Sequence, residues 1–497
     1  MKNKSLGLIL IIVLLFSTFL ASCEDGVLIL GSDNGQTTTT RKTAEKTTEP
    51  ESSKTAAQTL LPHVSGSESE SSSTSADTQT TQTAPDTDTT AAPKPTATAK
   101  PATTTEKQDD PVPTSSKTTG PPSEFSFLAC PDNIIHPSVY YDCLKKAAEK
   151  KGVEPDYKKL EGADYDFASL YTNVAGYIKN ADLSYVNVET LIGGEENGIS
   201  GYPTFNTPEA AGKTLIDLGF DIYNLAHNHM LDSYNDKYLI NCAKFFKDRG
   251  QTTIGYYKDK AATENIPVIE CKGIKVAFLA YTFSTNGIKL PSSSTTYIPY
   301  ADDDFMKKQI TKAKKIADLV FISMHWGSED TYSPNSEQRR VAQELCDWGV
   351  DAIIGMHSHV IQPMKWVENS NGRRTLLVYS LGNFISGMQD GFNMLGGMLS
   401  MNVYRDNDGN CGLKDVQFIP IVTHYVKKSA VRSDDTGHRE YKIYLVKDYT
   451  EELASKHGVQ IWDKSHKPTL VGGAFTKENL VATVKKYIPS EFLPSGF

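Results

Sequence analysis

Hydrophobic and polar positions change their period several times along the chain. Between residues 165 and 181, apolar residues recur at the three- and four-residue spacing of a helix. Short apolar runs such as Leu183–Val188 and Leu319–Met324 are typical of buried strands. Helical segments lie between such runs, as at Thr207–Gly219, which opens with Thr-Pro and closes with glycine. The pattern therefore predicts repeated β-α units.

The same pattern predicts further elements. The expected strands are 125–129, 221–226, 267–270, 275–281, 351–355, 375–381, 398–404 and 414–422, and the expected helices are 235–249, 302–317 and 335–348. The turn Lys272-Gly273 joins two of the strands, which predicts a hairpin. Because strands follow one another without helices after residue 375, we expect a layered α/β domain whose sheets become partly antiparallel.

The first 22 residues have the pattern of a signal peptide. Lys2 and Lys4 precede an apolar run from Leu6 to Phe19, which is shorter than the ~20 residues that span a bilayer. The stretch Leu-Ala-Ser-Cys at 20–23 resembles the lipobox of bacterial lipoproteins. This resemblance implies a lipid on Cys23 and a location at the extracellular face of the cell membrane; a coincidental cysteine in an ordinary signal peptide is the alternative.

Residues 23–123 are expected to form a disordered tether. They are rich in Thr, Ser, Ala and Pro and poor in aromatic residues, so they cannot bury enough apolar surface to offset their ordering entropy. A random coil of ~90 residues spans on the order of 50 Å, a distance suited to reaching into a cell wall. The folded domain is therefore expected at 124–430, followed by a C-terminal extension at 431–497 whose role the pattern leaves open.

Composition narrows the candidate functions. The net charge is −9 and no block of basic residues lies near the candidate site, so nucleic acid is not expected as a partner. Apart from Cys23, six cysteines are scattered without a Cys-x-x-Cys pair, which argues against a zinc ribbon. We expect them to be small buried hydrophobic residues more often than disulfide partners.

Chemically active side chains follow the predicted strands. In α/β sheets, functional residues gather at the carboxyl ends of strands, and most of the 11 histidines lie at such ends here. The stretches are 130–136 (CPDNIIH), 187–189 (NVE), 226–229 (AHNH), 325–329 (HWGSE), 355–359 (GMHSH) and 380–384 (SLGNF). Structural histidines have no reason to prefer one end of every strand, so the joint pattern predicts a metal centre.

Taken singly, the same residues have ordinary interpretations. Asp132 suits the N-cap of a helix opened by Pro137, Asn228 and Asp232 suit a turn, and His136 suits a surface position. Glu329 alone would be a solvated carboxylate. These alternatives weaken each signal but not their coincidence.

Imidazole nitrogens together with carboxylate and amide oxygens, and no thiolate, suit Mn, Fe or Zn. The supply of ligands exceeds the need of one ion, so we expect one or two divalent metal ions. A carboxylate that bridges two cations ~3.5–4 Å apart would clamp the oxygens of an in-line displacement, and a nearby histidine would protonate the leaving group. The letters of His227-Asn228-His229 do not indicate an HNH nuclease, because the ββα context and a basic groove are missing.

The order of these motifs resembles that of the calcineurin-like metallophosphoesterases. Their wording resembles more closely the capsule synthesis CapA family of poly-γ-glutamate biosynthesis proteins, over about residues 125–388. The resemblance implies a four-layer α/β/β/α sandwich of two mixed sheets. It places metal-ligand positions at Asp132, Glu189, Asn228, His229, His325, His357 and His359.

The chain departs from the phosphoesterase pattern at two motifs. Pro131 replaces the glycine of Gly-Asp-x-His, and the nearest histidine, His136, lies four residues after Asp132. The stretch Asn187-Val188-Glu189 replaces Gly-Asp-x-x-Asp, which puts a second ion in doubt. The remaining candidates are His229, His227 and Glu329 as catalytic groups and His136, Asn187 and Asn383 as further site residues.

The resemblance leaves more than one function open. One is an extracellular, membrane-tethered metal-dependent hydrolase that cleaves a phosphoester or an amide in a cell-surface polymer. Another is a non-catalytic component of a capsule synthase complex, whose metal holds the carboxylates of poly-γ-glutamate during synthesis or export. A third is a degenerate domain that binds partners through its fold alone.

Overall fold

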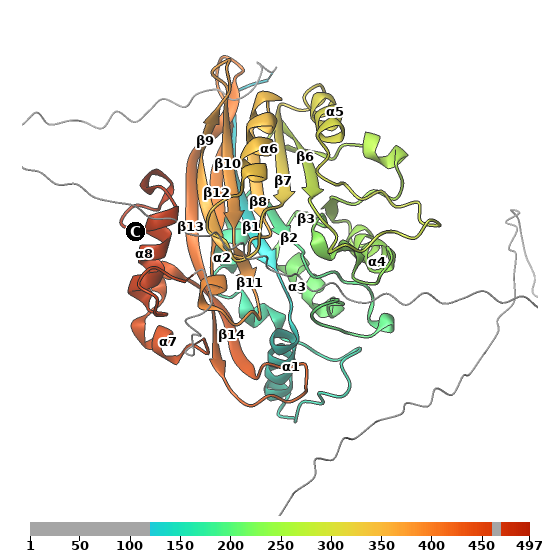
Figure 1. The fold of residues 1–497 in the computed structure, drawn as a ribbon, viewed down its shortest axis with the longest axis vertical. Helices are drawn as coiled ribbons and strands as arrows, with labels where there is room; N and C mark the ends of the chain where they lie inside the picture. The colour runs from blue at the N-terminus through green and yellow to red at the C-terminus, as the bar shows by residue number, and fades with distance from the viewer. Residues whose placement is uncertain (1–119, 460–468) are drawn as a thin grey trace, which may run out of the picture. The chain divides into compact units, whose positions relative to one another are not determined.

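A computed structural model describes residues 120–459 and 469–497. The expected signal peptide, Cys23 and nearly all of the expected tether lie outside the described residues. In the described ranges, no helix combines the length and the apolar character needed to cross a membrane. Two β-sheets and the helices that cover them make up the domain (Figure 1).

The larger sheet has eight strands and is mixed. Its order is β14-β13-β12-β1-β2-β3-β4, with β11 paired to the end of β1. The strands are β1 (Ser123–Asn133), β2 (Leu183–Asn187), β3 (Ile222–Asn224), β4 (Thr252–Ile254), β11 (Asn383–Ile385), β12 (Leu395–Arg405), β13 (Cys411–Lys427) and β14 (His438–Leu445). β1 to β4 run parallel, whereas β12 to β14 are antiparallel. The chain beyond residue 430 thus joins this sheet through β14.

The smaller sheet has six strands in the order β5-β6-β7-β8-β10-β9. The strands are β5 (Val268–Cys271), β6 (Ile274–Thr282), β7 (Leu319–His325), β8 (Ala352–Met356), β9 (Ile361–Glu368) and β10 (Arg374–Leu381). β6, β7, β8 and β10 are parallel, and β9 is antiparallel to β10. β5 and β6 pair antiparallel across the turn at Lys272, so the expected hairpin is confirmed.

Helices lie against the outer faces of the sheets (Figure 1). They are α1 (Pro137–Lys151), α2 (Ala175–Asn180), α3 (Glu209–Leu218), α4 (Lys237–Lys247), α5 (Asp303–Ala313), α6 (Ser336–Asp347), α7 (Glu451–Lys456) and α8 (Lys477–Tyr487). The prediction of one helix over residues 165–181 is wrong. It breaks into a 3-10 turn at Phe167–Leu170 and the short α2, and between them Asn173 donates a side-chain hydrogen bond to the carbonyl of Ile443 in β14.

The core has two layers, one on each side of the smaller sheet. In β6, Val276 and Phe278 face the larger sheet, whereas Leu279 faces the layer under α5 and α6. Across the first layer, the rings of Phe127 in β1 and Phe321 in β7 lie 5.4 Å apart. Because both faces of these strands are buried, their sequences are continuous apolar runs. The expected α/β fold of two mixed sheets between helices is confirmed.

The cysteines behave as small apolar residues. Cys130, Cys143, Cys242 and Cys346 are buried and form no disulfide. Burial raises the pKa of the Cys130 thiol well above its usual value, so this thiol stays protonated and inert.

The C-terminal residues are fixed to the rest of the domain by specific contacts. The carboxylate of Asp142 in α1 accepts the backbone N–H groups of Glu440 and Tyr441 in β14, both at 2.9 Å. At the other end, Tyr487 of α8 stacks on Tyr332, with ring centroids 4.3 Å apart and planes inclined by 7°. Tyr332 belongs to the loop that follows β7, so α8 holds a loop at the carboxyl edge of the smaller sheet.

Candidate metal centre

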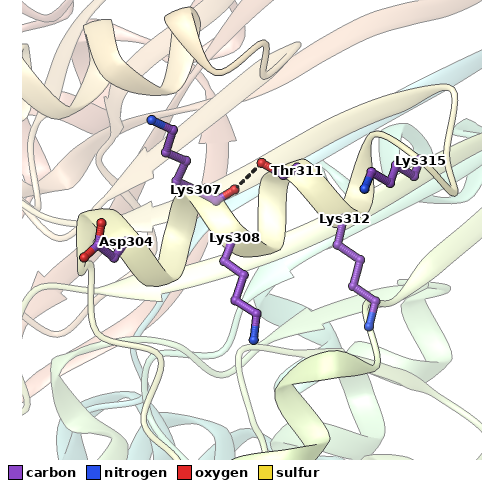
Figure 2. A pocket seen from close by; sticks show the side chains of 6 residues that line it. All are labelled: Asp304, Lys307, Lys308, Thr311, Lys312 and Lys315. Carbon is purple, nitrogen blue, oxygen red and sulfur yellow. Dashed lines mark hydrogen bonds between the residues drawn. The ribbon is translucent and has the colours of Figure 1, made fainter.

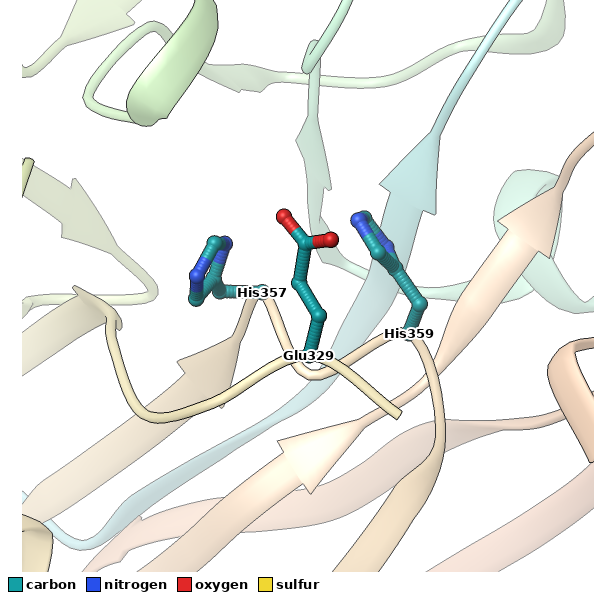
Figure 3. Close-up of side chains that lie close together, drawn as sticks. All are labelled: Glu329, His357 and His359. Atoms are coloured by element: carbon teal, nitrogen blue, oxygen red, sulfur yellow. The ribbon is translucent and has the colours of Figure 1, made fainter. Parts of the chain in front are cut away.

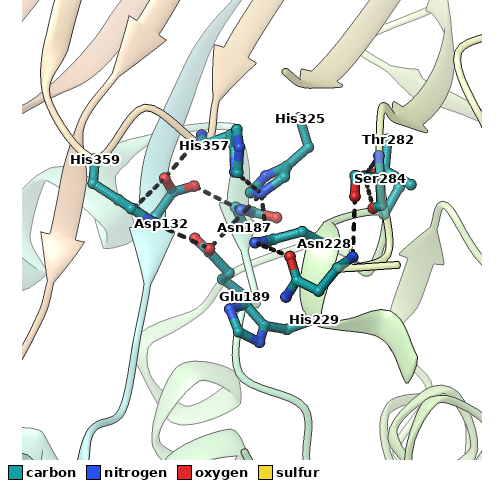
Figure 4. Close-up of polar contacts among 12 residues, drawn as sticks. Asp132, Asn187, Glu189, Asn228, His229, Thr282, Ser284, His325, His357 and His359 are labelled. Atoms are coloured by element: carbon teal, nitrogen blue, oxygen red, sulfur yellow. Dashed lines mark hydrogen bonds and ion pairs between the residues drawn. The ribbon is translucent and has the colours of Figure 1, made fainter. Parts of the chain in front are cut away.

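Polar side chains from both sheets converge at the carboxyl ends of the parallel strands (Figure 4). Asp132 lies near the carboxyl end of β1, where it pairs in register with Asn187 of β2. His325 ends β7, and His357 follows β8, the strand that pairs with β7 in the smaller sheet. Since β1–β3 and β6–β8 each run parallel, their ends bring residues that are distant in sequence to one edge.

One set of atoms, here called the first donor group, surrounds the Nε2 atom of His325. This atom lies 3.0 Å from Asn228 Oδ1, 3.1 Å from His357 Nδ1 and 3.7 Å from Glu189 Oε1. The amide of Asn228 is fixed in turn, because its Nδ2 donates to Asn286 at 3.2 Å. An amide oxygen, a second imidazole nitrogen and a carboxylate oxygen thus lie within 3.7 Å of His325 Nε2.

The second donor group consists of Asp132, Glu189 and His359, which offer ligand atoms within 4.8 Å of one another. His359 Nε2 lies 3.6 Å from Glu189 Oε1, the same oxygen that takes part in the first donor group. His359 Nδ1 lies 3.0 Å from Asn383 Oδ1, which directs the proton to Nδ1 and leaves the Nε2 lone pair for a ligand role. Glu189 is therefore placed to bridge the two groups.

The donor groups fit divalent cations. Metal–ligand bonds of ~2.1 Å separate neighbouring ligand atoms by roughly 3.0–3.4 Å, close to the shorter separations in the first group. Glu189 is fully buried, yet neither of its carboxylate oxygens forms a hydrogen bond with any described residue. Burial, followed by the charge of Asp132, raises its pKa well above the usual value. A buried carboxylate without hydrogen bonds is costly unless a cation offsets it.

The protonation of the histidines suits the same role. Burial, reinforced by His357, lowers the pKa of His325 well below its usual value. Burial lowers the pKa of His357 to about 3, so both imidazoles are neutral and have lone pairs to offer. For His359, burial lowers the pKa but Glu189 and Asp132 outweigh it and raise the pKa to about 10. A cation at the second group would therefore displace a proton from His359.

The backbone around His357 and His359 is unusual. Both residues have positive φ, 92° and 55°, a conformation that is costly for a residue with a Cβ. Gly355 lets β8 approach β10 closely, because a Cβ there would lie 2.0 Å from the carbonyl oxygen of Tyr379. The N–H of His357 donates to Asp132 Oδ2 at 3.1 Å. The turn is held in this strained form by its contact with the other sheet.

His229 lies outside both donor groups and has a different partner. Its Nδ1 lies 2.9 Å from Asp232 Oδ2, and its ring packs against Phe205 at 5.0 Å between centroids. Asp232 also accepts the N–H of Phe205 at 2.7 Å, so it is more than the ordinary turn residue that it suggests when taken alone. The signal for this pair was its spacing of three residues, which sequence reasoning passed over. Because Nδ1 of His229 is engaged by Asp232, Nε2 is the nitrogen that could act on a bound ligand.

Glu329 approaches the centre from the loop after β7. Figure 3 shows its carboxylate between the rings of His357 and His359, and all three offer ligand atoms within 4.8 Å of one another. Unlike Glu189, it is exposed. In the larger sheet, the Asn187 side chain donates to Asp132 Oδ1 at 2.7 Å and so orients the Asp132 carboxylate.

Two predicted residues occupy the surroundings of the donor groups. His227 is fully buried beside His325, with ring centroids 6.0 Å apart, and neither of its nitrogens has a hydrogen-bond partner among the described residues. His136 uses Nδ1 to accept the N–H of Gly387 at 3.0 Å. Burial lowers the pKa of His136 to about 3. Because its Nδ1 is engaged by Gly387, His136 is not counted in the second donor group, which keeps three members.

The two sheets and the donor groups define an α/β sandwich with a candidate metal site. The profile of the family described as "Bacterial capsule synthesis protein PGA_cap" matches residues 126–388, more than half of the chain. The chain belongs to this family.

Two curated relatives are similar to the chain. The "PGA biosynthesis protein CapA" of Bacillus subtilis is 26% identical over 68% of this chain and 85% of its own length. The "Capsule biosynthesis protein CapA" of Bacillus anthracis is 30% identical over 45% of this chain, and the match spans about half (54%) of that relative. Among solved structures, a 5'-nucleotidase precursor from Thermus thermophilus aligns over 60% of this chain and 54% of its own, with a TM-score of 0.37 and 12% identity.

Proposed function

We propose that this protein is a metal-dependent hydrolase that cleaves an ester or amide bond during the synthesis or processing of capsule material. The observation that carries the proposal is the position of Glu189, whose buried carboxylate has no hydrogen-bond partner among the described residues and is shared by the two donor groups. Family membership and the names of the relatives supply the link to capsule material.

The first donor group would hold one cation through Asn228, His325, His357 and Glu189. Bound there, a Mn, Fe or Zn ion supplies Lewis-acid polarisation of a phosphoryl or carbonyl oxygen. His229, oriented by Asp232 through Nδ1, would use Nε2 for proton transfer to the leaving group. The remaining step, removal of a proton from the attacking water, falls to Glu329, which is exposed beside His357 and His359.

The test uses the purified full chain supplied with Mn²⁺ and an aryl phosphate. We expect cleavage, two metal ions per chain by elemental analysis, and loss of both metal and cleavage in His357→Ala and Glu189→Gln. The matched control is Glu196→Gln, which changes an exposed carboxylate on the same loop. Cleavage that survives His357→Ala, or that falls equally in Glu196→Gln, contradicts the proposal.

A non-catalytic role is the second candidate, because His136 is engaged by Gly387 and the second donor group has only three members. In that case one ion would hold carboxylates of poly-γ-glutamate, in association with a capsule synthase complex, without turnover. Metal-dependent binding of oligo-γ-glutamate, measured by calorimetry in the absence of hydrolysis, would favour this candidate.

We also propose that the protein acts at the extracellular face of the cell membrane as a lipoprotein anchored through Cys23. The pattern of residues 1–23 supports this location. In cells, Cys23→Ser should move the protein from the membrane fraction to a soluble one, and unchanged fractionation would contradict the anchor.

A further inference from the structure

The lysines of α5 form a local excess of positive charge on an acidic chain. Five of the nine residues from Lys307 to Lys315 are lysine, whereas the net charge of the whole chain is −9. The opposite side of the helix is apolar, because Met306, Ile310 and Ala313 are buried in the layer between α5 and the smaller sheet. Packing therefore fixes the helix and leaves most of its lysines exposed.

A shallow groove of about 530 Å³ lies on the exposed side of α5 (Figure 2). Its lining comes from the helix and the turn that follows it, and consists of Asp304, Lys307, Lys308, Thr311, Lys312 and Lys315. These residues are spaced three or four apart, so they share one side of the helix. Figure 2 shows the side chains of Lys308 and Lys312 pointing the same way.

The lysines of the groove outnumber the carboxylates beside them. Lys308 and Lys312 share one carboxylate, that of Glu264, at 2.6 and 3.0 Å. These two lysines lower the pKa of Glu264 to about 2, so Glu264 stays ionised between them. Asp304 supplies the one carboxylate of the lining itself. The four lysines of the lining thus face two carboxylates, which leaves an excess of two positive charges.

Lysines on other helices are paired differently. In α1, for example, Lys145 forms an ion pair with Glu149, four residues further along the same helix. In α5, by contrast, Lys308 and Lys312 are themselves four residues apart. Like charges at this spacing destabilise a helix. The arrangement therefore costs helix stability, and it suits an anionic ligand better than it suits a solvated helix face.

The residue types in the groove restrict the ligand. Lysines three or four residues apart are separated by roughly 4.5–6 Å along the helix axis. A row of ammonium groups at this spacing suits an extended chain with repeated anionic groups better than one small anion. Lysine attracts carboxylates as a point charge. The six lining residues include neither an arginine, whose fork favours phosphate, nor an aromatic ring for stacking.

We infer that this groove on α5 binds an extended acidic polymer that carries a carboxylate on each residue. The groove is separate from the metal centre, because α5 covers the face of the smaller sheet that points away from the larger sheet (Figure 1). The inference goes beyond the proposed function, since the groove holds the polymer by charge and without the metal. It agrees with membership of a capsule synthesis family.

The test measures binding of labelled oligo-γ-glutamate to the full chain, once with Mn²⁺ and once with EDTA. We expect equal binding in both, weakened as the salt concentration rises, because exposed charges are screened. Lys307→Gln combined with Lys315→Gln should weaken binding about fivefold, since each exposed ion pair contributes modestly. Glu264→Gln should strengthen binding, because Lys308 and Lys312 lose their shared carboxylate.

Two controls separate the groove from the overall charge of the chain. Lys145→Gln combined with Lys244→Gln makes the same change in net charge at exposed lysines of α1 and α4, and should leave binding unchanged. The fully amidated form of the same oligomer has no carboxylates and should not bind. Equal weakening in both double variants, or equal binding of the two oligomers, overturns the inference.

Two further outcomes would also overturn the inference. Binding that requires Mn²⁺ and is lost in His357→Ala would place the polymer at the metal centre. Binding of vesicles rich in phosphatidylglycerol, in place of the oligomer, would identify the groove as a membrane-binding surface.

The proposed function is tested separately from this inference. Cleavage of the aryl phosphate should be the same in the Lys307→Gln, Lys315→Gln variant as in the unchanged chain. Absence of cleavage from both would contradict the proposed function, whereas the binding measurements with EDTA would still decide the inference.

Discussion

Two groups of buried histidines lie in the described part of this molecule, and they differ in the hydrogen-bond partners of their ring nitrogens. In the C-terminal group, His457 is a neutral ring with both nitrogens paired: Nε2 donates to the Thr423 carbonyl at 3.0 Å and Nδ1 accepts the N–H of Val459 at 3.1 Å. His424 pairs its Nδ1 with the hydroxyl of Tyr449 at 2.7 Å. Aromatic rings surround both.

In the metal centre, by contrast, nitrogens point at other nitrogens and at carboxylates. His325 Nε2 faces His357 Nδ1 at 3.1 Å, and His325 Nδ1 has no hydrogen-bond partner among the described residues. Polar groups with hydrogen-bond partners indicate a structural role, whereas convergent groups without such partners suit a ligand-binding site. The hydrogen-bond partners thus distinguish histidines that stabilise the fold from histidines that the fold positions as candidate metal ligands.

The sharpest way to break this comparison is to remove one histidine from each group. His325→Ala should reduce kcat/KM by about a thousandfold and lower the metal content, because a ligand is lost. His457→Ala should keep the metal content but lower the free energy of unfolding by about 3 kcal/mol, since a buried ring and two hydrogen bonds are lost. Enzyme assays, elemental analysis and urea unfolding measure the three quantities. Equal metal loss in both variants would erase the distinction.

Acid should lower stability through the buried histidines of both groups, and the C-terminal group contributes a separable share. Burial lowers the pKa of His424 to about 4 and, with its neighbours, that of His457 to about 3, below the ordinary value of 6.5. The unfolded chain takes up protons below pH 6.5 that the folded chain refuses, so stability is complete above that pH and falls as the pH drops toward 4. The slope is about 1.4 kcal/mol per pH unit for each histidine.

Urea unfolding of the metal-free chain across this pH range measures the slope. His424→Gln should make it shallower by the share of one histidine. An unchanged slope would mean that His424 does not stay neutral in the folded chain.

The smallest effect is expected at His136. Because its Nδ1 accepts the N–H of Gly387, His136→Gln keeps an acceptor near that position and should change kcat/KM by less than about threefold, with unchanged metal content. Loss of one ion per chain in this variant would show that His136 is a ligand, and would place it in the second donor group.

The sequence predicted those parts of the fold whose signal is local. β6, β7 and β8 are continuous apolar runs because both of their faces are buried, and the polar residues that follow them lie at the strand ends where the parallel arrangement requires them. β4, β9, β11 and β14 were missed. β4 and β11 have only three residues each, whereas β9 and β14 lie at sheet edges, where half-exposed positions, and Pro363 in β9, obscure the strand pattern.

The candidate site can be recognised from the sequence only as far as residue type indicates it. Histidines and carboxylates at strand ends can be read from the sequence, but the pairing of Asp232 with His229 and the engagement of His136 by Gly387 depend on how loops from different strands meet. The positive φ of His357 and His359 has no signal in a sequence that carries histidine rather than glycine there.

The stacking of Tyr487 on Tyr332 has a consequence for biosynthesis. The loop that presents Glu329 is clamped by a residue that leaves the ribosome long after the loop itself. Hydrogen bonds to Ser358, Gln362 and Asn393 also hold this loop, but the ring that packs on Tyr332 belongs to the last part of the chain to be made. The loop that carries Glu329 would thus reach its final packing only in a chain that extends to Tyr487.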